Sequence, residues 1–87
     1  MIRRHVVQPD RYYDSVRLMA VSGQLEALPG VHRAAAMMGT AANRDLLRDA
    51  GLLDAEAAAA LQPSDLVIAV QADDDRAAEA ALATAER

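Results

Sequence analysis

The chain has 87 residues, which is room for one domain, and it contains no cysteine. The lack of cysteine excludes disulfides, thiolate metal ligands and a thiol nucleophile, and the formal net charge of −4 argues against general nucleic-acid binding, which needs a basic face. Two tyrosines are the only aromatic residues, so the core must be built from Ala, Leu, Val, Met and Ile.

The first half of the chain predicts a strand, a helix and a second strand. Residues 2 to 8, IRRHVVQ, have β-branched residues at their centre and end at Pro9-Asp10, which favours a strand followed by a turn. A helix then follows, capped by Asp14 or Ser15, with apolar residues at helical spacing, and it stops at Pro29-Gly30. The segment VHRAAAMMG predicts a strand again, although alanine favours strands only weakly.

The second half predicts two short helices, a strand and a final helix. NRDLLRDAG and DAEAAAALQ read as helices separated at Gly51, with Asp54 as the cap of the second. LVIAV, residues 66 to 70, is a continuous apolar run and predicts a central strand covered on at least one face. Asp73, Asp74 and Asp75 then open a helix with an alanine-rich apolar stripe.

This order predicts an α+β fold, a ferredoxin-like α/β sandwich of the form β-α-β-(αα)-β-α. We expect a right-handed first crossover and helices gathered on one face of a small sheet that lacks a clear last strand. A sheet that ends there leaves an exposed edge, and such edges invite pairing with another chain. A basic beginning and an acidic end of the chain favour the same outcome.

The segment AAAMMGTAANRDLL is the first candidate site. A strand that ends at Gly39 and Thr40 and leads into a helix places free backbone N–H groups and a positive helix end together, with Asn43 and Arg44 nearby for an anion. The favoured alternative is a plain connection in which Gly39 turns the chain and Thr40 or Asn43 caps the helix. The segment lacks the glycine fingerprints of nucleotide-binding loops.

The segment RYYDSVR is the second candidate site, because it concentrates both tyrosines beside arginines. Arg11, Tyr12, Tyr13 and Arg17 are residue types that interfaces favour. In the structural alternative one tyrosine covers the sheet and Asp14 pairs with Arg17. Arg3 and Arg4 in the first strand add further expected contacts.

Other polar groups are better explained without chemistry. His5 and His32 have no partner at metal-ligand spacing, the aspartate triplet lacks the pattern of a calcium loop, and no serine lies beside a base. We therefore expect no catalytic residue, no metal site and no cofactor. With no leader pattern and no membrane span, the chain reads as a cytoplasmic protein without membrane contact.

The segments YYDSVRLM and MGTAANRDLL followed by GLL, with LPGV and PSDLVIAVQA, resemble the N-terminal region of FdrA-type proteins, relatives of the succinyl-CoA synthetase α subunit. The resemblance covers residues 1 to 87 as a single FdrA N-terminal-like domain. The CoA-binding loop and the phosphate-carrying histidine of the related synthetases have no counterpart here, so the resemblance implies a module that is not catalytic alone.

Two functions remain open from the sequence. The leading expectation is an interaction or regulatory module that forms a homo-oligomer or binds an FdrA-like or succinyl-CoA-synthetase-like subunit of an acyl-CoA ligase or carbamoyltransferase system. The alternative is a small-molecule sensor that binds an anionic metabolite at the turn from Gly39 to Arg44.

Overall fold

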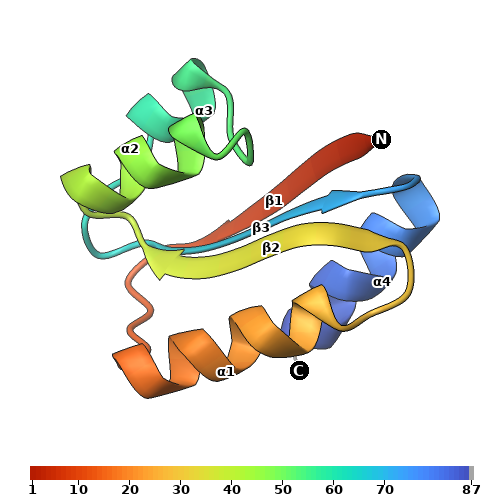
Figure 1. The fold of residues 1–87 in the computed structure, drawn as a ribbon. Helices are drawn as coiled ribbons and strands as arrows, with labels where there is room; N and C mark the ends of the chain where they lie inside the picture. Colours follow the sequence, from red (N-terminus) through yellow and green to blue (C-terminus); the bar gives the residue numbers. More distant parts are fainter. Residues whose placement is uncertain (87) are drawn as a thin grey trace.

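The computed structural model, described here for residues 1 to 86, is a three-stranded antiparallel sheet with four helices (Figure 1). The strand order is β1-β3-β2, and both outer strands run antiparallel to β3. This arrangement confirms the predicted ferredoxin-like α+β sandwich. The elements, in chain order, are β1 (Ile2–Gln8), α1 (Ser15–Glu26), β2 (Val31–Met38), α2 (Ala41–Asp49), α3 (Ala55–Ala59), β3 (Leu66–Ala72) and α4 (Asp75–Ala85).

Side chains of four residues cap the helices, as the sequence pattern led us to expect. Asp14, Thr40, Asp54 and Asp74 each accept a hydrogen bond from the backbone N–H three residues further on. These bonds satisfy donors that a helix leaves free in its first turn. Because Thr40 is the cap, α2 begins two residues before the predicted start at Asn43.

The helices cover both faces of the sheet, whereas the sequence led us to expect them on one face. Helices α1 and α4 lie on the first face, and α2 and α3 lie on the second, which Figure 1 shows in green on the opposite side of the strands. The physical reason is a second apolar cluster: α2, α3 and the loops around them supply leucines that need a covered surface. These leucines are Leu47, Leu52, Leu53 and Leu61.

The central strand β3 explains how one short sheet serves two cores. Its alternate residues Leu66, Ile68 and Val70 pack into the first cluster, and Val67 and Ala69 pack into the second. All five are at most 1% exposed. A strand buried on both faces needs apolar residues at every position, which is why LVIAV is continuous rather than alternating.

Within residues 1 to 86, no helix is both long and apolar enough to cross a bilayer.

Candidate functional site

The turn from Gly39 to Arg44 is held by internal hydrogen bonds. The N–H of Gly39 donates to the carbonyl of Asp65 at 2.9 Å, and the Asn43 side-chain amide donates to the carbonyl of Met38 at 2.9 Å. A Cβ on Gly39 would collide with the backbone oxygen of Gln62. Glycine is therefore required here by the close approach of the loop before β3, independently of any ligand.

Arg44 contacts the segment before β3, which also packs against Gly39. Its guanidinium reaches the carbonyl of Leu61 at 3.5 Å, and its Nε is buried without a hydrogen-bond partner among the described residues. Together with Arg48 and Asp45 it lines a hollow of about 250 Å³ between α2 and α3. The anion site predicted from the sequence stays a prediction, and its arginine shares this hollow with Arg48, which was not among the predicted contacts.

The two tyrosines have different environments. Tyr13 is 6% exposed, and two guanidinium groups contact its ring: Cζ of Arg17 is 3.9 Å from the ring centroid and Cζ of Arg11 is 5.4 Å from it. Arg11 also donates to the Tyr13 hydroxyl at 3.1 Å. The Asp14 carboxylate accepts from the backbone N–H of Arg17 at 2.9 Å instead of pairing with its side chain. Tyr13 thus covers the sheet and is held by cation–π contacts.

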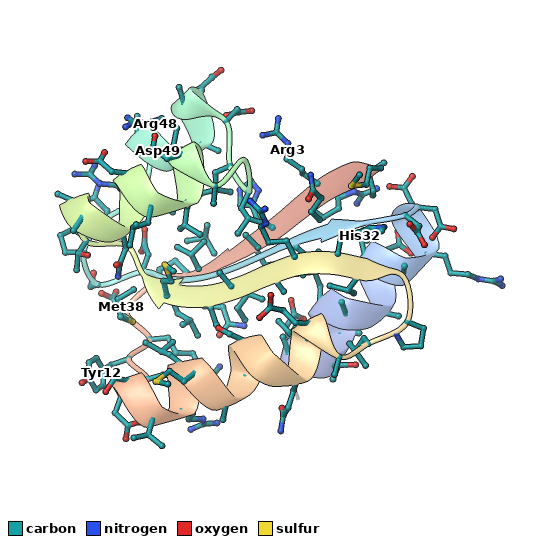
Figure 2. The ribbon with its side chains drawn as sticks, in the orientation of Figure 1. Arg3, Tyr12, His32, Met38, Arg48 and Asp49 are labelled. Atoms are coloured by element: carbon teal, nitrogen blue, oxygen red, sulfur yellow. The ribbon has the colours of Figure 1, made fainter. Side chains whose placement is uncertain are left out.

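Tyr12 is 76% exposed and joins the two candidate segments (Figure 2). It lines an open, largely apolar hollow of about 400 Å³ with Met38 and Thr40, at the end of the sheet where β1 and β2 finish. Asp10, Pro63 and Ser64 complete this hollow. Asp10 has a φ of 55°, a left-handed conformation that aspartate tolerates better than most residues. The turn predicted at Pro9-Asp10 was the signal in the sequence for this left-handed position.

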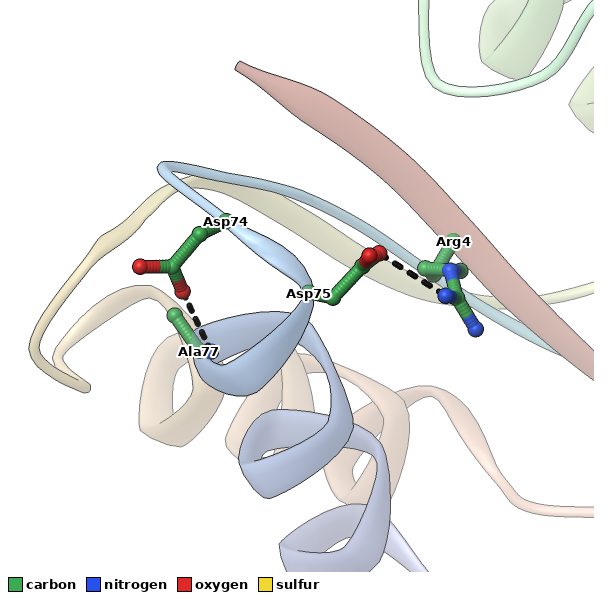
Figure 3. A network of polar contacts seen from close by, with 4 residues as sticks. All are labelled: Arg4, Asp74, Asp75 and Ala77. Carbon is green, nitrogen blue, oxygen red and sulfur yellow. Dashed lines mark hydrogen bonds and ion pairs between the residues drawn. The ribbon is translucent and has the colours of Figure 1, made fainter.

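Arg3 and Arg4 lie at the other end of the sheet, apart from Tyr12 and Thr40. Arg3 is opposite Gln71 and donates to the carbonyl of Gly51 at 3.2 Å, while Arg4 forms an ion pair with Asp75 at 2.8 Å (Figure 3). Asp75 follows the cap Asp74, so the basic beginning of the chain meets its acidic end within the same molecule. The structure therefore does not gather all predicted contacts into one site.

The two histidines do not share a site with each other. His32 on β2 contacts the carboxylate of Asp73, and His5 lies exposed on β1 opposite Ala69. Among residues 1 to 86, no group of three His, Cys, Asp or Glu side chains is placed to hold a metal ion.

The fold and these surfaces define a small ferredoxin-like α+β domain whose polar side chains serve mainly caps, turns and surface contacts. A family model described as "AllF, heavy metal-associated domain" matches residues 1 to 87, and the chain belongs to this family. The chain is also 38% identical over 65 residues to the uncharacterized protein YahF of Escherichia coli strain K12, which covers 75% of this chain and 12% of YahF. No solved structure matches the chain.

The residues present do not fit the heavy metal in the family description. Soft metals are bound chiefly by thiolate and imidazole ligands, and this chain has no cysteine and two histidines that face different partners.

Proposed function

We propose that this chain is a noncatalytic interaction or regulatory module that assembles with itself or with an FdrA-like acyl-CoA ligase or carbamoyltransferase system. The observation that carries the proposal is an α1 apolar patch formed by Tyr12, Val16 and Met19, which are 76%, 76% and 74% exposed. Large apolar side chains exposed at this level around one helix are typical of a surface that binds another protein.

The relationship to YahF supports a module that works beside further domains. The chain spans about an eighth of that relative's length, so the matching segment there is a small part of a much longer chain. The FdrA-like partner follows from the resemblance of YYDSVRLM and MGTAANRDLL to the N-terminal region of FdrA-type proteins.

The experiment is a tagged pull-down from the native host with mass spectrometry, together with the solution mass of the eluted complex. We expect recovery of an FdrA-like or succinyl-CoA-synthetase-like chain or a concentration-dependent oligomer. Met19→Glu should abolish either association, because it places a charge in the α1 apolar patch.

Leu46→Glu is the matched control, since Leu46 is a 56% exposed leucine on α2, outside the patch. A chain that stays monomeric at high concentration and retains no partner contradicts the proposal. Equal loss in both variants also contradicts it.

A second candidate function is an anion sensor, and the unpartnered Nε of Arg44 favours it. Arg44 and Arg48 line the same hollow, and a carboxylate or phosphate that bridges the two guanidinium groups would compete with Asp45 and Asp49, which already pair with Arg48. Isothermal titration with inorganic phosphate and with small dicarboxylates tests this candidate. Arg44→Ala should remove binding while the chain stays folded, and unchanged affinity rules the site out.

A further inference from the structure

The two outer edges of the sheet differ in whether their backbone groups are free. Both β1 and β2 pair only with β3, so each has one edge without a neighbouring strand. Such edges present rows of N–H and C=O groups that another strand can pair with unless side chains occupy them.

The β2 edge is blocked by side chains. The outward N–H of Ala36 donates to the hydroxyl of Ser22 on α1 at 2.9 Å, and the carbonyl of Met38 accepts from the side-chain amide of Asn43 at 2.9 Å. A strand that paired with β2 would have to displace both contacts. The protein itself therefore occupies this edge at Ala36 and Met38.

The hydrogen bond from Ala36 to Ser22 also shows which backbone groups of β1 face outward. Ala36 and Val6 are both paired with Ile68, and Ala36 directs its N–H away from β3. Two residues paired across an antiparallel ladder direct their backbone N–H and C=O groups either toward each other or away from each other. Since those of Ala36 point away from β3, those of Ile68 point away from β2 and toward β1. The backbone groups of Val6 therefore point toward β3. The backbone N–H and C=O groups of Arg3, His5 and Val7 therefore face away from the sheet.

These outward groups of β1 are not occupied by the rest of the protein. Within residues 1 to 86, no side chain or loop forms a hydrogen bond with the backbone of Arg3, His5 or Val7 from the open side. A further strand can thus form backbone hydrogen bonds with these three residues of β1 without displacing an existing contact.

Arg3, His5 and Val7 point to the second face of the sheet, whereas Ile2, Arg4 and Val6 point to the first face, where Arg4 is already paired with Asp75. Arg3 and His5 are exposed on the second face, where Figure 2 shows Arg3 projecting on the side that carries α2. Ile2 and Val6 lie on the first face, packed against the core beneath α4. No acidic residue occurs in Ile2–Gln8.

We propose that the β1 edge binds an extended segment of a partner protein that runs antiparallel to β1 and alternates acidic with apolar residues. The acidic side chains would lie beside Arg3 and His5, and the apolar side chains would extend the first core beside Ile2 and Val6. This surface lies on β1, apart from the α1 apolar patch, so it goes beyond the proposed function and can fail independently of it.

Charge argues against a second copy of this chain as the occupant. Antiparallel pairing of two β1 strands about His5 would place His5 opposite His5 and Arg3 opposite Val7, so each copy would offer no acidic side chain to Arg3 of the other. An acidic partner segment supplies the opposite charge that a second copy lacks.

The test uses two peptide probes with the 87-residue chain, one alternating glutamate with valine and one alternating lysine with valine. Binding is followed by NMR, with amide hydrogen exchange measured at Arg3, His5 and Val7. We expect the glutamate peptide alone to bind and to slow exchange at these three amides. Arg3→Glu should weaken its binding about tenfold and allow the lysine peptide to bind.

Arg76→Glu is the control with the same change of charge, because Arg76 lies beside Gly30 on α4, away from the β1 edge. His5→Pro is the second variant: it removes an outward N–H that β3 does not use, and it should prevent binding of the glutamate peptide. The proposal is overturned if the two peptides bind equally or if the glutamate peptide protects other residues instead. It is also overturned if amide exchange at Arg3, His5 and Val7 slows when the protein concentration alone is raised. The last result would assign the edge to a second copy.

Discussion

At the residue scale, Gly39 has a structural role that the sequence left open. The turn at Gly39 and Thr40 was a candidate anion site, yet the glycine lies where the loop before β3 passes too close for a side chain. Its N–H is also bonded to Asp65, which is 7% exposed and whose carboxylate accepts from the N–H of Gln62 at 2.8 Å. The identity of this residue is thus set by packing between two loops.

We predict that Gly39→Ala destabilises the domain by about 1 to 3 kcal/mol, because the new methyl group meets rigid backbone and the loops must shift. Urea unfolding measures the change. Gly23→Ala is the matched control: a Cβ on Gly23 meets nothing within 4 Å, and the helical position should gain about 0.5 to 1 kcal/mol. A Gly39→Ala chain as stable as the parent would show that the loops adapt freely.

At the element scale, α1 is held to the sheet by an apolar face and by one polar contact. Leu25 is fully buried in the first cluster. The hydroxyl of Ser22 donates to the carbonyl of Leu18 at 2.8 Å and accepts from the N–H of Ala36. This one hydroxyl satisfies an edge donor of β2 and keeps other strands from pairing there.

We predict that Ser22→Ala lowers stability by about 1 kcal/mol and speeds amide exchange at Ala36, because that N–H loses its partner in a half-buried position. Amide exchange followed by NMR measures the effect. Thr84→Ala is the control, since the Thr84 hydroxyl bonds only within its own helix, to the carbonyl of Ala80 at 2.9 Å. Unchanged exchange at Ala36 in the Ser22 variant would contradict this account of the β2 edge.

At the scale of the whole molecule, membership of the family does not bring a metal site with it. The chain belongs to a family described as heavy metal-associated, while its sequence has no cysteine and its described residues form no cluster of three ligating side chains. A shared fold does not transfer a binding site, because the site depends on particular side chains.

We predict that titration with Zn²⁺ or Cu⁺ gives no stoichiometric heat and leaves the melting temperature unchanged. A ligand that binds only the folded state would raise the melting temperature, so the two measurements check each other. One-to-one binding that is lost in His5→Ala or His32→Ala would contradict the prediction and would identify a site built on those histidines.

The sequence by itself determined the elements and their order. Caps at Asp54 and Asp74, stops at Pro29-Gly30 and Gly51, and the apolar run from Leu66 onward depend on local backbone chemistry, which neighbouring residues specify. For the same reason the α+β class and the ferredoxin-like order followed from the pattern alone.

Only the tertiary structure decided which surfaces are free. Three features depend on contacts between residues far apart in the chain. They are the placement of α2 and α3 on the second face, the burial of Tyr13 with Tyr12 left exposed, and the bond from Ala36 at the β2 edge to Ser22. Helical or strand spacing cannot specify such contacts, because it fixes the direction of a side chain relative to its own element and not what that element packs against.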